Sequence, residues 1–113
     1  MYDGEGLIDK ETLKKGVEHA DALVSLLSTS VDKDIIDSAN NLKIIANYGA
    51  GFNNIDVEYA RQQNIDVTNT PHASTNATAD LTIGLILSVA RRIVEGDHLS
   101  RTTGFDGWAP LFF

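Results

Sequence analysis

The chain has 113 residues, of which 42% are hydrophobic and 22% charged, and its formal net charge is −7 at pH 7. This length predicts one domain at most, and the composition is typical of a globular chain. The acidic balance disfavours nucleic acid or an anionic membrane as the main partner, and the lack of cysteine excludes a disulfide framework, a thiolate metal site and a cysteine nucleophile.

Segments typical of helices alternate along the chain with segments typical of buried strands. A helix is expected from Asp9 to about His19, because Leu13 and Val17 lie four residues apart on one face. The short apolar run Ala22–Leu27 predicts a strand that is buried on both faces.

A second helix is expected to begin after Ser30, which stands in the N-cap position. Asp32 and Asp34 then lie in the first turn, where their negative charges complement the helix dipole. The next apolar run, Leu42–Tyr48, predicts a second strand that leads directly into a glycine-containing turn.

The same alternation continues after the turn. Asp56 is expected to cap a short helix that ends near Arg61, and Ile65–Asn69 predicts a third strand. Three strands that alternate with helices indicate an α/β fold with a parallel sheet.

The strongest predicted helix runs from about Thr75 to Val94, capped by Ser74 or Thr75, and the tail from Ser100 onward has no period. Residues 81–90 of this helix are apolar nearly all round, so other structure is expected to cover it. A membrane span needs about 20 apolar residues, which makes a buried helix the expected state. With an acidic, polar N-terminus and no secretory signal, a cytoplasmic protein is expected.

Both ends of the chain suggest a piece of a longer protein. The turn-like stretch Asp3–Gly6 stands where an open α/β sheet normally starts with a strand, and the chain ends on the apolar Leu111–Phe113.

The turn within Asn47–Asp56 is the most informative segment for function. It follows a predicted strand and precedes a predicted helix, so it lies at the edge of a parallel sheet where ligands bind. Gly49 and Gly51 allow backbone N–H groups to face outward and cradle an anion such as a carboxylate. The alternative is that both glycines only make a tight turn. A dinucleotide fingerprint is absent, because Asn54 occupies the place of its third glycine.

Three motifs, NYGAGFNNID, VTNTPHASTNATADLTIGLILSVARR and TGFDGWAPL, resemble the D-isomer-specific 2-hydroxyacid dehydrogenases from about Ala22 to the end of the chain. The likeness is closest to the glyoxylate/hydroxypyruvate and 2-ketogluconate reductase branch. It implies a partial flavodoxin-like substrate domain at residues 1–74. Residues 75–113 would form a linking helix and the crossing into a Rossmann domain that binds NAD or NADP. The catalytic arginine, glutamate and histidine of the family would lie beyond this chain, so no catalytic residue is expected here.

The resemblance also implies roles for particular residues. The loop that holds the substrate carboxylate through its backbone amides would consist of Tyr48, Gly49, Ala50 and Gly51. Thr78 matches a position beside the nicotinamide ring, with a local helix-capping hydroxyl as the alternative. Trp108 matches a tryptophan that reaches toward the neighbouring subunit's active site, or else it anchors the crossing between domains.

These expectations define a functional hypothesis with two rivals. The whole protein would reduce a small 2-oxo acid such as glyoxylate or hydroxypyruvate to the D-2-hydroxy acid, and this stretch would position the substrate. A homodimer or higher self-association is expected, and the 113-residue chain alone is expected to be inactive. The rivals are a nucleotide-sensing corepressor-like binding module and an unrelated flavodoxin-like domain with a small-anion site. No metal site is expected, because the three histidines, His19, His72 and His98, are scattered.

Overall fold

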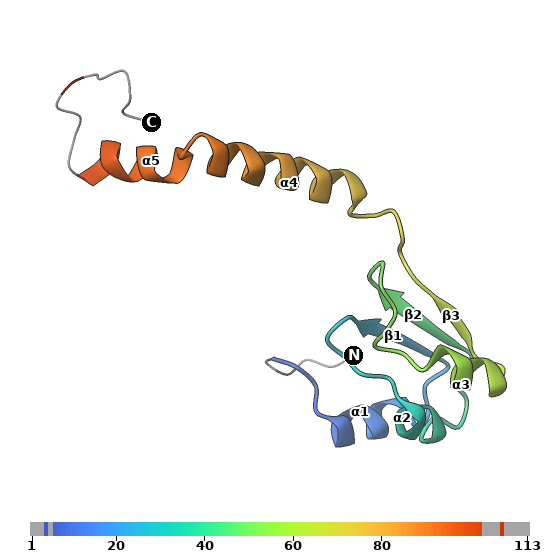
Figure 1. The fold of residues 1–113 in the computed structure, drawn as a ribbon. Coiled ribbons are helices and arrows are strands. Elements are labelled where there is room, and N and C mark those ends of the chain that lie inside the picture. Colours follow the sequence, from blue (N-terminus) through green and yellow to red (C-terminus); the bar gives the residue numbers. More distant parts are fainter. Residues whose placement is uncertain (1–3, 5, 103–106, 108–113) are drawn as a thin grey trace. The chain divides into compact units, whose positions relative to one another are not determined.

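The computed structural model describes Gly4, residues 6–102 and Gly107, and the chain divides into two compact units, Met1–Ala73 and Ser74–Phe113. The first unit alternates helices and strands along the chain (Figure 1). Its elements are α1 (Lys10–Val17), β1 (Ala22–Leu26), α2 (Lys33–Asp37), β2 (Ile44–Tyr48), α3 (Val57–Gln62) and β3 (Asp66–Thr68). The second unit contains α4 (Thr75–Ala90) and α5 (Ile93–Thr102).

The three strands form one parallel sheet in the order β1-β2-β3. Ala22 is paired with Ile44, and Ile44 is paired in turn with Asp66, so all three strands start at the same edge. All three carboxyl ends therefore lie at the opposite edge. The α/β class and the parallel sheet predicted from the sequence are confirmed.

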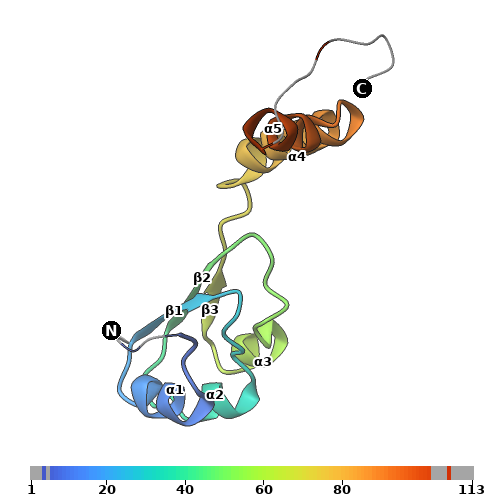
Figure 2. The same ribbon diagram turned by 90° about the vertical axis from the view of Figure 1, so that its left-hand side faces the viewer.

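Helices α1, α2 and α3 all lie on one face of the sheet (Figure 2). The core between them is built from buried aliphatic side chains, among them Val31, Ile35 and Ile45, which are completely inaccessible to solvent. Within this unit no described helix covers the other face, where Val24 of β1 remains 72% exposed. The prediction that the first strand is buried on both faces was therefore wrong for this unit.

Aspartates cap the first two helices of this unit. Asp9 accepts a hydrogen bond from the Thr12 backbone N–H at 2.9 Å, which stabilises the first turn of α1. The cap of α2 is Asp32, which accepts from the Ile35 N–H at 3.1 Å, and the prediction of Ser30 was wrong. The reason is tertiary: Val31 still has extended backbone because it pairs with Ile55 in an isolated parallel bridge, so the helix begins later.

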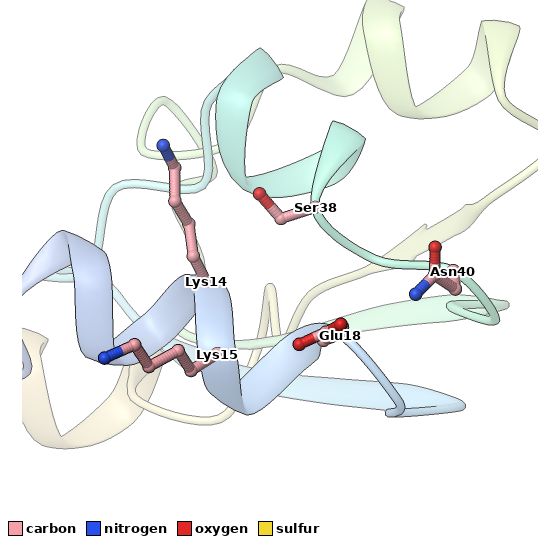
Figure 3. Close-up of a pocket in the computed structure, with 5 residues that line it drawn as sticks. All are labelled: Lys14, Lys15, Glu18, Ser38 and Asn40. Atoms are coloured by element: carbon pink, nitrogen blue, oxygen red, sulfur yellow. The ribbon is translucent and has the colours of Figure 1, made fainter.

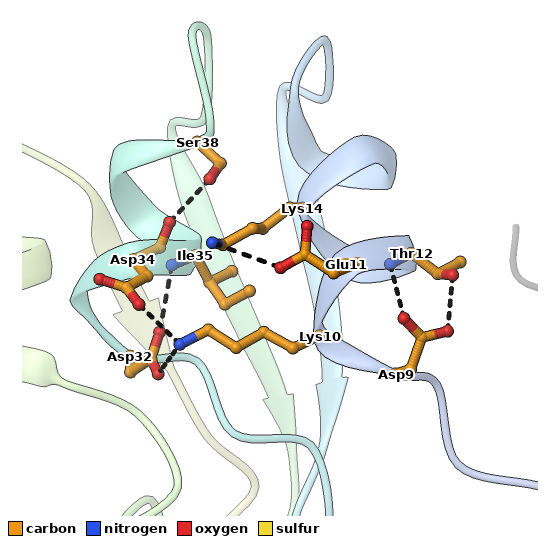
Figure 4. Close-up of polar contacts among 9 residues, drawn as sticks. All are labelled: Asp9, Lys10, Glu11, Thr12, Lys14, Asp32, Asp34, Ile35 and Ser38. Atoms are coloured by element: carbon orange, nitrogen blue, oxygen red, sulfur yellow. Dashed lines mark hydrogen bonds and ion pairs between the residues drawn. The ribbon is translucent and has the colours of Figure 1, made fainter.

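An exposed ion-pair cluster joins α1 to α2 (Figure 4). The Lys10 ammonium lies 2.7 Å from a carboxylate oxygen of Asp32 and 2.7 Å from one of Asp34. These two hydrogen bonds raise the pKa of Lys10 to about 12, and the bond to Asp32 has the larger effect. The same bonds lower the pKa of each of the two aspartates. The N-cap Asp32 and the first-turn Asp34 thus pair with a lysine on another helix as well as with the helix dipole.

The second unit differs from the single helix that the sequence predicted. The backbone of Arg92 is left-handed, with φ of 51°, so α4 ends at Ala90 and a separate α5 follows. Residues 100–102, predicted as part of an aperiodic tail, belong to α5. Neither helix buries any residue. Among the residues that the structure describes, no helix is long and apolar enough to cross a membrane.

Candidate functional site

The predicted anion-binding loop, Tyr48–Gly51, begins at the last residue of β2, at the carboxyl edge of the sheet. At this edge, residues of the turn within Asn47–Asp56 are bonded to the end of β1 and to the segment that follows β3. Asn54 donates through its side-chain amide to the carbonyl of Leu26 at 3.1 Å, and Asn69 donates to the carbonyl of Ala50 at 2.8 Å. The loop therefore lies at the sheet edge where open parallel sheets bind their ligands.

Two consecutive carbonyl groups of this loop are bonded to the segment that follows β3. The Gly49 carbonyl accepts from the backbone N–H of Thr70 at 3.0 Å. The Ala50 carbonyl accepts from the side-chain amide of Asn69 at 2.8 Å. In a trans peptide the N–H points opposite to the carbonyl, and the described part of the chain contains no cis peptide bond. The N–H groups of Ala50 and Gly51 therefore point away from residues 69 and 70.

These two N–H groups are the chemically available part of the loop. Neither donates a hydrogen bond to any described residue, and both Ala50 and Gly51 are exposed. The Gly49 N–H is already used, because it donates to the Asn47 carbonyl at 3.0 Å. Successive outward N–H groups carry partial positive charge and suit an anion. Of the predicted loop, the amides of Ala50 and Gly51 are thus the ones available to donate to an anion.

The glycines serve the loop in a different way from the one expected. Among the described glycines only Gly6 and Gly107 have positive φ, so neither loop glycine depends on left-handed backbone. At Gly49 the need is steric, because a Cβ atom there would lie 2.4 Å from Cδ2 of Leu27. At Gly51 a Cβ would meet only an oxygen of Asn53 at 3.6 Å, an ordinary contact.

A network of polar side chains, two of them buried, is hydrogen-bonded to the loop. Ser25 donates through its hydroxyl to the side-chain oxygen of Asn47 at 2.9 Å, and both side chains are at most 2% exposed. Asn47 in turn donates through its side-chain amide to the Gly51 carbonyl at 2.6 Å. The Asn54 amide joins the network at 3.2 Å from the Asn47 oxygen. Every buried side-chain polar atom in the described residues has a hydrogen-bond partner.

Ser25 and Asn47 were not predicted from the sequence as supporting residues. The available signal was the interruption of two apolar strand runs, ALVSL and IIANY, by a polar residue each. A polar side chain in a buried strand needs a partner, and strand pairing puts Ser25 opposite Asn47 in the register. Pairing of these two residues could not be inferred until the register was known.

The other predicted site residues belong to the second unit. Thr78 lies in the first turn of α4, where its N–H donates to the Ser74 carbonyl at 2.9 Å. Its hydroxyl forms no hydrogen bond within the described chain, so these contacts give the local-capping alternative no support. Trp108 lies outside the described residues. Tyr48 ends β2 with 72% of its surface exposed.

No three acidic or histidine residues of the described chain are arranged to hold a metal ion. A shallow hollow lies between α1 and the segment after α2, lined by Lys14, Lys15, Glu18, Ser38 and Asn40 (Figure 3). No residue of the Tyr48–Gly51 loop lines this hollow, and none of its lining side chains is fully buried.

Comparison with known proteins agrees with the resemblance seen in the sequence. The family model described as "D-isomer specific 2-hydroxyacid dehydrogenase, catalytic domain" matches residues 2–109. A curated Staphylococcus epidermidis protein that carries the name 2-hydroxyacid dehydrogenase is 99% identical over 113 residues. That match covers 100% of this chain and 36% of the relative, so the chain spans about a third of its length.

Solved structures share the fold. A crystal structure of a Thermus thermophilus protein has a TM-score of 0.86 and 42% identity, covering 95% of this chain and 35% of that one. The 3-phosphoglycerate dehydrogenase of Entamoeba histolytica, solved with bound NAD+, has a TM-score of 0.65 and 35% identity. That match covers 73% of this chain and 27% of the other.

Proposed function

Since this chain belongs to the D-isomer specific 2-hydroxyacid dehydrogenases, we propose that a full-length protein carrying it reduces a small 2-oxo acid to the D-2-hydroxy acid. The described residues would contribute the positioning of the substrate. The observation that carries this proposal is the pair of outward N–H groups at Ala50 and Gly51, at the carboxyl edge of the sheet.

In this proposal the substrate carboxylate accepts hydrogen bonds from both N–H groups. A hydrogen bond to an ionised acceptor is about twice as strong as one between neutral groups. Because the carbonyls of Gly49 and Ala50 are already bonded to residues 69 and 70, the amides are oriented before the substrate arrives. Such pre-organisation lowers the entropic cost of binding and fixes the direction in which the 2-oxo group points. Tyr48, exposed beside these amides, would border the substrate.

We further propose glyoxylate or hydroxypyruvate as substrate, NAD or NADP as cofactor, and the cytoplasm as compartment. When bound, such a cofactor would supply the hydride that reduces the 2-oxo group. The turn from Gly49 to Asn54 does not fit the pyrophosphate of a dinucleotide, because Asn54 stands where the third glycine would be and its amide is bonded to the carbonyls of Leu26 and Thr29. Other parts of the full-length protein would hold the cofactor, with Thr78 beside the nicotinamide and Trp108 near a neighbouring subunit's site.

The enzyme is favoured over the non-catalytic alternatives by the comparisons, in which the family model is that of a dehydrogenase. The direct test uses a full-length protein with this stretch, such as the Staphylococcus epidermidis relative. We expect oxidation of NADH or NADPH that depends on added glyoxylate or hydroxypyruvate. Lack of turnover with every small 2-oxo acid tried, with either cofactor, would contradict the proposal.

The isolated 113-residue chain provides the complementary test. We expect no turnover above the blank, because the sequence has no complete dinucleotide fingerprint and none of its histidines matches the catalytic histidine that the family resemblance implies. Turnover by the pure chain would show that residues of this stretch perform chemistry as well as positioning.

A further inference from the structure

The two carbonyl groups that orient the loop are held by different kinds of donor. The Gly49 carbonyl is bonded to a backbone N–H, that of Thr70, which any residue other than proline would supply. The Ala50 carbonyl is bonded to a side chain, the amide of Asn69, and no other described residue donates to it. The direction of the Ala50–Gly51 peptide therefore depends on which residue occupies position 69.

We propose that Asn69 is a positioning residue for the substrate carboxylate and acts through the Ala50–Gly51 peptide. This inference rests on the proposed function of the loop. A peptide unit rotates as a rigid plane, so the bond that holds the Ala50 carbonyl also sets the direction of the Gly51 N–H. A hydrogen bond weakens steeply when its angle falls below about 120°. Rotation of this peptide plane would therefore weaken the hydrogen bond from the Gly51 N–H to the substrate carboxylate.

Asparagine is chemically suited to this position. Its side chain is neutral and carries two N–H donors, so it can bond a carbonyl without placing a negative charge near an anionic substrate. Aspartate has nearly the same shape but only accepts hydrogen bonds when ionised, and it would repel both the Ala50 carbonyl and the substrate. Asn69 is half-buried and directly precedes Thr70, so adjacent residues hold adjacent peptides of the loop.

The test compares three variants of the full-length Staphylococcus epidermidis relative, numbered as in this chain. Asn69→Ala removes the donor without adding charge, and Asn69→Asp removes it with almost no change in size. Asn41→Ala is the matched control, because Asn41 is exposed and its side chain forms no hydrogen bond to the described chain. Each variant is assayed for glyoxylate and for its neutral methyl ester. Thermal unfolding and calorimetric titration with glyoxylate accompany the assays.

We expect Asn69→Ala to raise KM for glyoxylate by about tenfold, with a smaller change in kcat and an unchanged Tm. The ratio of kcat/KM for glyoxylate to that for its ester is expected to fall by a similar factor, because the ester has no carboxylate to lose. Asn69→Asp should raise KM for glyoxylate, and lower this ratio, by more than Asn69→Ala does. A general loosening of the structure would lower kcat/KM for both substrates by the same factor and would also lower Tm.

The inference is overturned if Asn69→Asp keeps the wild-type KM and the wild-type preference for glyoxylate over its ester. If Asn69→Ala lowers Tm, the test rests on the KM and the substrate preference of the isosteric Asn69→Asp variant. A wild-type protein that binds glyoxylate in the calorimeter without turnover would contradict the proposed reaction alone, and weaker binding by the Asn69 variants would still support the positioning role. A wild-type protein that neither binds nor reduces a small 2-oxo acid would overturn both.

Discussion

Gly49 faces the side chain of Leu27 so closely that a Cβ atom at position 49 would lie 2.4 Å from Cδ2 of the leucine. Leu27 directly follows β1 and Gly49 directly follows β2, so this contact joins the ends of two paired strands. The absence of a side chain at position 49 therefore lets the loop pass beside the leucine. This explains one loop glycine by close approach instead of by backbone conformation.

Gly49→Ala is expected to destabilise the fold by about 1–2 kcal/mol, because the leucine must move to admit the methyl group. Leu27 is 53% exposed, which gives its side chain room to turn and keeps the cost modest. In the double variant with Leu27→Ala the clash disappears, so the two effects should be less than additive. Urea denaturation of the four proteins measures this coupling, and strict additivity would contradict the contact.

Gly51 is expected to respond in substrate binding and not in stability. A Cβ there meets only an oxygen of Asn53 at 3.6 Å, so the backbone admits a side chain. A bulky Gly51→Val would cover the adjacent N–H groups and raise KM for glyoxylate in the full-length protein by about tenfold or more. Gly51→Ala should have a smaller effect. An unchanged KM in a folded valine variant would favour the alternative that the glycines only make a turn.

The buried pair of Ser25 and Asn47 should show unequal costs. Ser25→Ala is expected to cost about 0.5–1.5 kcal/mol, because the Asn47 oxygen keeps its bond from Asn54 at 3.2 Å. Asn47→Ala should cost about 1–3 kcal/mol or more, because it leaves both the Ser25 hydroxyl and the Gly51 carbonyl without a partner. Chemical denaturation measures both costs, and equal values would show that the network does not depend on Asn47.

The ion-pair cluster of Lys10 with Asp32 and Asp34 predicts a pH window for stability. The aspartate pKa values are lowered from 3.8, so their contribution is present above that value and is lost as pH falls through the lower folded values. The Lys10 pKa is raised from 10.5 to about 12, so its contribution is complete below 10.5 and is lost as pH rises through about 12.

Lys10→Met tests this window, with Lys15→Met as control because Lys15 is an exposed lysine of the same helix with no ion pair to the described residues. We expect Lys10→Met to lower the free energy of unfolding at neutral pH, with a difference from wild type that shrinks in strong acid and in added salt. Equal effects of the two substitutions at neutral pH would refute the cluster's contribution.

Self-association of the isolated chain is a further expectation. In α4 the apolar side chains Leu81, Ile83, Leu85, Ile86, Leu87 and Val89 are each more than half exposed. Burial of one such side chain gains about 1.5–3 kcal/mol, so a second copy that covers several of them should repay the entropic cost of association. Light scattering at micromolar concentrations checks this, and a monodisperse 12.3 kDa species would contradict it.

Local sequence patterns were sufficient for the class of fold and for placing the predicted loop at the carboxyl edge of the sheet. Apolar runs at Ala22–Leu27, Leu42–Tyr48 and Ile65–Asn69 correspond to the three strands, because a strand needs only a few consecutive residues of the right type to be recognised. Asp56 capped its helix as expected, since a cap bonds to an N–H only three residues away.

Contacts between distant residues decided the rest. The pairing of Val31 with Ile55 delayed the start of α2, and the register that sets Ser25 opposite Asn47 built the network below the loop. The orientation of the Ala50 and Gly51 amides depends on bonds from residues 69 and 70, about 19 positions further along the chain. Residue spacing encodes which side chains share a local face. The direction of a peptide N–H is set by the group that bonds to the carbonyl of the same peptide unit, and that group is brought into place only when the sheet assembles.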